Sequence, residues 1–359
     1  MHLMPLPSLQ AAGEPLAPGL PGWADPALVA GIAAYRRHPW QRALPDPPAL
    51  WTEGGARLLD YRRASPGGAP GDGCPVLFVP SLVNRAYVLD LLPERSLLRW
   101  LAEEGVRPLL LDWGWPDAED RRLTLSGLVA GRLVRALEAS AAATGRAVVL
   151  AGYCMGGLLA LAAALHRPDL LRGLVLLATP WDFHAARPDD ARRLAATLPL
   201  LEPLMAQTGS VPVDALQALF AQADPGAVAA KYRAFGRMDQ SGDAARDFVA
   251  LEDWLNDGVP LAAPVAREAL GEWYGANTPG RGTWRMAGGT VAPAALAVPA
   301  LVAVPGRDRI VPPESALPLA RLIPGATLVQ PAAGHIGMVA GPRARDALWL
   351  PLLDWLRGL

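Results

Sequence analysis

Cysteine and lysine are scarce in this chain of 359 residues, and no charge of either sign accumulates. Two cysteines, Cys74 and Cys154, exclude a fold held together by several disulfides. Lysine occurs once, at Lys231, and the net charge is −1 without a basic cluster, so we expect no nucleic-acid partner. The first residues lack the basic and apolar segments of a secretory signal, which predicts a cytoplasmic protein with reduced thiols.

The chain has enough apolar residues for a large core. Hydrophobic residues make up 52% of it and charged residues 19%, which is typical of a folded protein. Its length exceeds what one compact core usually holds, so we expect an insertion or a second domain. Residues 147–165 carry no charge, but clustered glycines interrupt this run, and we expect no membrane span.

Short apolar segments alternate with amphipathic ones along most of the chain. Six runs suit buried parallel strands, at residues 75–80, 106–112, 146–153, 172–179, 299–305 and 326–331. Apolar residues at three- and four-residue spacing predict helices between most of them. The alternation predicts an α/β fold with a mostly parallel, doubly wound sheet.

Two parts of the chain interrupt this alternation. Residues 1–55 are rich in proline and predict an arm, and residues 186–295 predict an inserted helical cap. The core is then formed by residues 56–185 and 296–359. Ligands of such folds bind beyond the carboxyl ends of the strands, where a cap would cover the site and exclude water.

Cys154 lies between a predicted strand and a predicted helix, in the sequence GYCMGG at residues 152–157. A strand, a glycine-flanked nucleophile and a helix form the nucleophile elbow of α/β-hydrolases. A buried cysteine that acts only as a small apolar residue is the alternative. Whether Cys154 is a nucleophile or a small apolar residue of the core therefore depends on whether the sequence also offers a base and an acid for it.

A nucleophilic cysteine requires a base, and five histidines are available. His335 follows the last predicted strand in a glycine-flanked loop, PAAGHIGM, where α/β-hydrolases place their base. His184, in TPWDFHAA after an earlier strand, is the second candidate. His2, His38 and His166 lie in the arm or far along the helix.

The histidine in turn requires a carboxylate that fixes its tautomer. Asp308 directly follows a predicted strand and precedes His335, which gives the order nucleophile, acid, histidine. Asp182 is the alternative, because some members of the fold take the acid from that strand. Either aspartate could instead cap a turn or a helix.

A cysteine nucleophile favours transfer of an acyl group. Attack on a thioester exchanges one thioester for another, so the acyl group stays activated. A helix N-terminus and an adjacent imidazole favour the reactive thiolate. We expect the backbone N–H groups of Met155 and Val83 to bind the oxyanion.

The motifs of the core resemble the polyhydroxyalkanoate synthase family, most closely the short catalytic subunits of its class III. The similar segments, in the family's order, are PSLVNRAYVLDL (80–91), ERS (94–96), LLLDWGWPD (109–117), GYCMGG (152–157), TPWDFH (179–184), GRDRIVPP (306–313) and AGHIG (333–337). The resemblance covers residues 76–185 and 299–338.

The resemblance implies an acyltransferase of the α/β-hydrolase superfamily that polymerises (R)-3-hydroxyacyl-CoA. Cys154 would carry the growing polyester as a thioester, with His335 as base, Asp308 as its partner, and Val83 and Met155 as oxyanion donors. No cofactor and no metal are implied beyond the CoA thioester that is the substrate. The family also implies a second synthase subunit, a homodimer and a place at the surface of polyester granules.

Two other functions remain open at this point. A cysteine hydrolase, acting as a thioesterase or an intracellular depolymerase, would use water in place of the alcohol. A protein that retains the fold without catalysis would form no acyl-enzyme. A dry tunnel under the cap favours transfer, and an open wet cleft favours hydrolysis.

Overall fold

A computed structural model describes residues 25–63, 73–223 and 225–359. The beginning of the predicted arm, residues 1–24, therefore lies outside the described residues. The described residues divide into two compact units, one formed by residues 25–39 and 225–249 and the other by residues 40–63, 73–223 and 250–359.

The larger unit is built on an eight-stranded sheet with the order β1-β2-β4-β3-β5-β6-β11-β12. The strands β1, β2 and β4 pair antiparallel, and all the other neighbours pair parallel. The predicted α/β fold with a mostly parallel sheet is thereby confirmed. The strands are Ala49–Glu53 (β1), Ala56–Asp60 (β2), Pro75–Val79 (β3), Arg107–Asp112 (β4), Val148–Tyr153 (β5), Leu171–Leu177 (β6), Ala300–Ala303 (β11) and Thr327–Val329 (β12).

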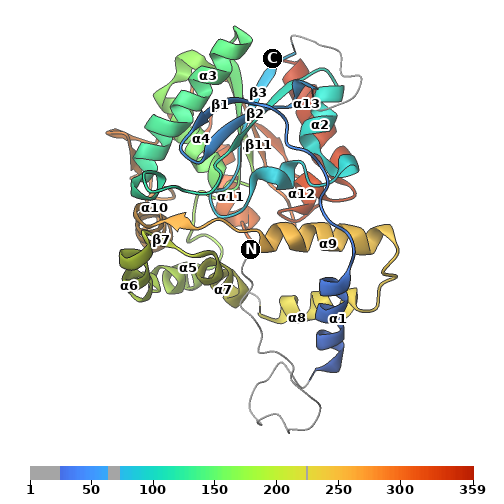
Figure 1. Cartoon of the computed structure of the whole chain (residues 1–359). Coiled ribbons are helices and arrows are strands. Elements are labelled where there is room, and N and C mark those ends of the chain that lie inside the picture. The colour runs from blue at the N-terminus through green and yellow to red at the C-terminus, as the bar shows by residue number, and fades with distance from the viewer. Residues whose placement is uncertain (1–24, 64–72, 224) are drawn as a thin grey trace. The chain divides into compact units, whose positions relative to one another are not determined.

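Helices cover both faces of this sheet, as Figure 1 shows. One core cluster packs α3, α4 and α11 against the sheet, and a second packs α2, α12 and α13 against its other face. The central strands β3, β4 and β5 are buried along their whole length, which explains the apolar run in each, flanked in β4 by Arg107 and Asp112. The helices are Leu97–Glu103 (α2), Val134–Thr144 (α3), Met155–His166 (α4), Pro313–Leu322 (α11), Gly337–Ala340 (α12) and Leu350–Arg357 (α13).

The strands β1 and β2 were not predicted from the sequence. The side chains of β1 are all exposed or half-buried, so this strand has no continuous apolar run to indicate it. It begins at Ala49, within the segment expected to be the arm. The hairpin that it forms with β2 adds an antiparallel edge to the parallel sheet.

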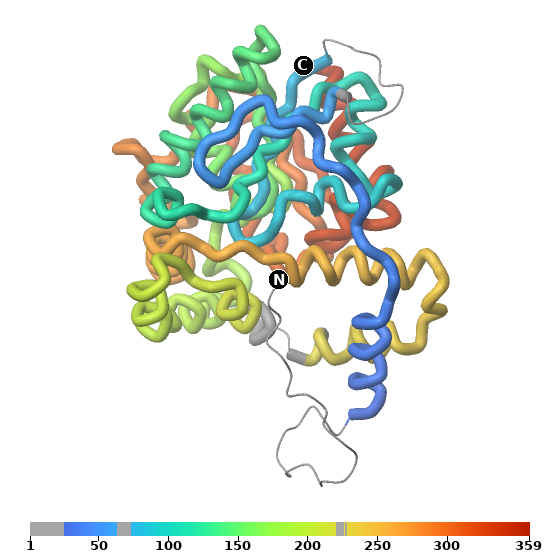
Figure 2. The backbone as a smooth tube through the Cα atoms, viewed as in Figure 1, coloured from blue at the N-terminus to red at the C-terminus, as the bar shows by residue number. Residues whose placement is uncertain are grey.

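Between β6 and β11 the chain makes a long excursion, coloured green-yellow to orange in Figure 2. Its part in the larger unit contains the π-helix η7 (Ala269–Gly275) and two small antiparallel sheets. The helices are Pro188–Ala195 (α5), Leu198–Thr208 (α6), Val213–Ala223 (α7) and Ala263–Glu268 (α10), and the strands are Ser210–Val211 (β7), Leu261–Ala262 (β8), Arg285–Met286 (β9) and Gly289–Thr290 (β10).

The smaller unit joins a helix of the expected arm to helices of the expected cap. It contains α1 (Pro26–Arg37), α8 (Pro225–Phe235) and the first half of α9 (Asp243–Asn256). Helices α1 and α8 pack so closely that a Cβ atom on Gly31 would lie 1.9 Å from the carbonyl oxygen of Tyr232. Phe235 and Phe248 stack with their ring centroids 4.3 Å apart.

Shorter helices complete the described chain. These are the 3-10 helices Tyr61–Arg63, Ala86–Leu89, Pro93–Arg95, Asp120–Arg122, Pro168–Leu170 and Pro293–Ala295, and the π-helices Gly127–Leu133 and Arg345–Trp349. None of the helices in the described ranges has the length and apolar character that a membrane span requires.

Candidate functional site

Cys154 occupies a sharp turn between strand β5 and helix α4. Its backbone has φ 55° and ψ −126°, a conformation that is strained for a residue other than glycine. Its N–H donates to the carbonyl of Leu177 on the neighbouring strand β6, over 2.8 Å. This strained turn places Cys154 at the carboxyl edge of the sheet, at the first turn of α4.

Two glycines of the GYCMGG motif are required because other backbone atoms approach them closely. A Cβ atom on Gly152 would lie 2.4 Å from the Cα atom of Gly157. A Cβ atom on Gly156 would lie 2.2 Å from the carbonyl oxygen of Val79 and 2.5 Å from that of Pro80. The end of β3 therefore packs directly against the first turn of α4.

His335 and Asp308 lie together at the same edge of the sheet. The Nδ1 atom of His335 is 2.6 Å from Oδ2 of Asp308, whose side chain is fully buried. The other carboxylate oxygen of Asp308 accepts the backbone N–H groups of Ile310 and Val311 at 2.8 and 2.9 Å. Because Asp308 pairs with Nδ1, the Nε2 atom is the one that can exchange a proton with a reacting group.

Cys154 interacts with this histidine–aspartate pair. Burial alone would lower the pKa of His335. The charge of Cys154, hydrogen bonds to Asp308 and Cys154, and the charge of Asp308 together raise it to about 10. The structure thus places the side chains of Cys154, His335 and Asp308 where they interact, and their action as a catalytic triad stays a prediction.

The protonated form of His335 should make stability depend on pH. Its folded-state pKa, about 10, exceeds the ordinary value of 6.5, so its contribution is complete below pH 6.5 and is lost as the pH rises through 10. The difference in unfolding free energy between the wild type and His335→Gln should therefore fall by about 1–3 kcal/mol over this range. Urea unfolding of both proteins at pH 6, 8 and 10 measures this difference in unfolding free energy. A difference that is constant with pH would contradict the raised pKa of His335.

Tyr153, which was not predicted from the sequence, also contacts His335. Its hydroxyl donates to the backbone carbonyl of His335 over 3.3 Å, and the two ring centroids are 5.1 Å apart. Burial, and then the charges of Cys154 and Asp308, raise the pKa of Tyr153, so the hydroxyl remains a donor. Its position directly before Cys154 was the available signal in the sequence.

The alternative residues His184 and Asp182 make different contacts. The Nε2 atom of His184 lies 2.8 Å from the backbone carbonyl of Tyr274. Asp182 accepts the side-chain N–H of Asn277 and the backbone N–H of His184, both at 2.9 Å. These two residues therefore connect the segment after β6 to the inserted segment. His166 is exposed at the end of α4, and His38 belongs to the smaller unit.

The two expected oxyanion donors lie on the segments that meet at Gly156. Met155 is the first residue of α4, where a helix leaves its N–H groups without internal partners. Val83 lies in the loop after β3, and its carbonyl accepts the N–H of Val259 over 3.1 Å. Their joint action on one oxygen atom stays a prediction.

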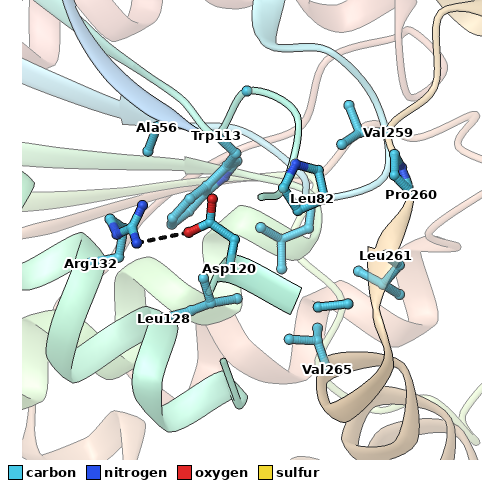
Figure 3. Close-up of a pocket in the computed structure, with 13 residues that line it drawn as sticks. Ala56, Leu82, Trp113, Asp120, Leu128, Arg132, Val259, Pro260, Leu261 and Val265 are labelled. Carbon is cyan, nitrogen blue, oxygen red and sulfur yellow. Dashed lines mark ion pairs between the residues drawn. The ribbon is translucent and has the colours of Figure 1, made fainter. Parts of the chain in front are cut away.

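A cavity of about 50 Å³ is lined by Leu82, which directly precedes Val83 in the loop after β3 (Figure 3). Trp113 lines it and donates its indole N–H to the carbonyl of Pro80 over 3.1 Å. Val259 lies on the other side of the cavity, and its backbone N–H donates to the carbonyl of Val83. The charged residues of the cavity, Asp120 and Arg132, pair with each other at 2.7 Å. Residues that line this cavity therefore hydrogen-bond to two positions of the loop after β3, Pro80 and Val83.

The comparison with known families agrees with this architecture. The family model described as the alpha/beta hydrolase fold matches residues 75–342. The chain therefore belongs to the α/β-hydrolase fold family. Within the described ranges, no three histidine, cysteine, aspartate or glutamate side chains form a group that could hold a metal ion.

Within this fold, the chain is related to polymerases of poly(3-hydroxyalkanoate), which confirms the resemblance predicted from its motifs. It is 30% identical over 311 residues to the poly(3-hydroxyalkanoate) polymerase subunit PhaC of Haloferax mediterranei, covering 85% of this chain and 62% of that protein. It is 29% identical over 305 residues to the protein of the same name from Allochromatium vinosum, covering 84% of this chain and 85% of that protein.

A solved structure shares the fold at lower identity. The thioesterase domain from the curacin biosynthetic pathway aligns with a TM-score of 0.51 and 16% identity, covering 85% of this chain and 95% of that domain. This similarity concerns the fold alone.

Proposed function

We propose that the protein is an acyltransferase that polymerises (R)-3-hydroxyacyl-CoA into polyhydroxyalkanoate through a thioester on Cys154. The observation that carries the proposal is a cysteine on a strained elbow that interacts with the buried His335–Asp308 pair. The similarity to poly(3-hydroxyalkanoate) polymerase subunits supports the substrate class. We also propose that the protein acts with a second synthase subunit, forms a homodimer and lies at the surface of polyester granules.

In the first step, the Cys154 thiolate attacks the thioester carbon of the hydroxyacyl-CoA. A bond forms from Sγ to carbon, the bond from carbon to the CoA sulfur breaks, and His335 gives its proton to the leaving thiolate. The backbone N–H groups of Met155 and Val83 would hold the negative oxygen of the intermediate. Asp308 keeps the imidazole in one orientation and stabilises its charged form.

In the second step, the 3-hydroxyl of another hydroxyacyl-CoA attacks the acyl group on Cys154. His335 takes the hydroxyl proton at Nε2, an ester bond forms, and the bond from carbon to Sγ breaks. The product is a CoA thioester longer by one unit, which can acylate Cys154 again. Repetition of these two steps gives a polyester and one free CoA for each unit added.

The test incubates the purified protein with (R)-3-hydroxybutyryl-CoA, follows free CoA and measures the intact mass of the protein. We expect CoA release and a series of hydroxybutyrate units attached to the wild type, and neither with Cys154→Ala. Release of CoA with only free hydroxy acid would contradict transfer and indicate a thioesterase. Full activity in Cys154→Ala would contradict the covalent mechanism.

A further inference from the structure

The loop that carries His335 has to reach back along the edge of the sheet to meet Cys154. Strands β6 and β11 lie between β5, which ends directly before Cys154, and β12, which precedes His335. The segment after β11 holds the first part of this loop, because the backbone N–H of Arg307 donates to the carbonyl of Ala333 over 3.0 Å. This bond lies on the side of β11, so the end of the loop nearest Cys154 depends on other contacts.

Tyr153 provides such a contact on the side of β5. It is the last residue of β5, and only 2% of its surface is exposed. Its hydroxyl donates to the backbone carbonyl of His335 over 3.3 Å. Its ring lies beside the imidazole, with the centroids 5.1 Å apart and the planes inclined by 35°. Tyr153 therefore restrains both the backbone and the side-chain ring of His335.

The hydroxyl of Tyr153 serves this contact and not the packing of the core. The preceding residues of β5, VVLAG, are apolar or glycine, and a phenylalanine ring would fill the same space in their core cluster. A buried tyrosine hydroxyl costs free energy unless it has a hydrogen-bond partner. The partner here is the carbonyl of the residue expected to be the base.

The bond to Asp308 does not by itself fix the imidazole. A single hydrogen bond at Nδ1, 2.6 Å from Oδ2 of Asp308, leaves the ring free to tilt about that bond. The ring of Tyr153 limits this tilt, and its hydroxyl limits movement of the backbone that carries the imidazole. In the proposed steps Nε2 has to reach both the CoA sulfur and the 3-hydroxyl, and a misplacement of about 1 Å can cost about 10²-fold in rate.

We propose that Tyr153 is a positioning residue that keeps Nε2 of His335 directed at the groups that react on Cys154. This inference rests on the proposed function and adds a residue that acts through the base. Removing the hydroxyl of Tyr153 should therefore slow acylation only while the imidazole is present.

The test measures single-turnover acylation of Cys154 by (R)-3-hydroxybutyryl-CoA in Tyr153→Phe, which keeps the ring and loses the hydroxyl. We expect a rate about tenfold below that of the wild type, as the loss of one hydrogen bond implies. In a His335→Ala background the same substitution should cause no further loss, because no imidazole is left to position. A loss that came only from a weaker fold would be equal in the two backgrounds.

The matched control is Tyr61→Phe. Tyr61 is 1% exposed and belongs to the same core cluster as Tyr153, and its hydroxyl donates to Oδ2 of Asp90 over 3.1 Å. This variant also loses a buried hydroxyl and one hydrogen bond, so urea unfolding should show both variants folded and similarly destabilised. Acylation of Tyr61→Phe should nevertheless proceed at the wild-type rate.

The outcomes separate this inference from the proposed function. Three results would overturn the role of Tyr153 while acylation of the wild type still supports the transferase. These are a wild-type rate in Tyr153→Phe, an equal loss with and without the imidazole, and an equal loss in Tyr61→Phe. If the wild type is not acylated, the proposed function fails and the role of Tyr153 fails with it.

Discussion

Replacing His335 with alanine should reduce the acylation of Cys154 by (R)-3-hydroxybutyryl-CoA by about 10²–10⁴-fold. The variant loses the group that interacts with the Cys154 side chain and that, in the proposed mechanism, protonates the leaving CoA thiolate. It also leaves the buried carboxylate of Asp308 without its imidazole partner. Single-turnover release of CoA, followed with a thiol reagent, measures the rate.

Two further variants show whether the loss belongs to the proposed chemistry. Asp308→Asn should reduce the rate less than His335→Ala, because the imidazole remains but loses the carboxylate that fixes its tautomer. His166→Ala should retain the wild-type rate, since His166 is exposed at the far end of α4. Acylation of His335→Ala at the wild-type rate would contradict the assignment of the base.

The candidate triad could be predicted because its three residues follow strands that the sequence indicates. Cys154 follows β5 directly, Asp308 follows β11, and His335 follows β12. The carboxyl ends of parallel strands meet at one edge of a sheet, so order along the chain predicts nearness in space. The distance of 2.6 Å between His335 and Asp308 depends on loop conformations that no periodicity encodes.

The parts that escaped prediction depend on contacts between distant segments. Helix α1 packs on α8, almost two hundred residues further along the chain, and the amphipathic pattern of each helix does not specify the partner. The contact of His184 with Tyr274 joins positions ninety residues apart. The sequence therefore offers His184 as a second candidate base, although in the structure its Nε2 atom bonds to the backbone carbonyl of Tyr274.

Replacing Gly156 with valine should damage both the fold and the candidate site. The first added carbon would lie 2.2 Å from the carbonyl oxygen of Val79 and 2.5 Å from that of Pro80. Both are backbone atoms, so α4 and the loop after β3 must move apart, at a cost of about 1–3 kcal/mol in unfolding free energy. Because Met155 and Val83 lie on these two segments, acylation of the variant that still folds should also be slower.

The matched control is Gly271→Ala, a glycine in the helix that carries Tyr274. A Cβ atom there meets nothing within 4 Å, so the substitution should leave stability unchanged or raise it by about 0.5–1 kcal/mol. Urea unfolding of both variants, with CoA release measured on the folded fraction, tests the contrast. Gly156→Val could instead prove as stable and as active as Gly271→Ala. Close packing of the elbow against the loop after β3 would then not be what positions the N–H groups of Met155 and Val83.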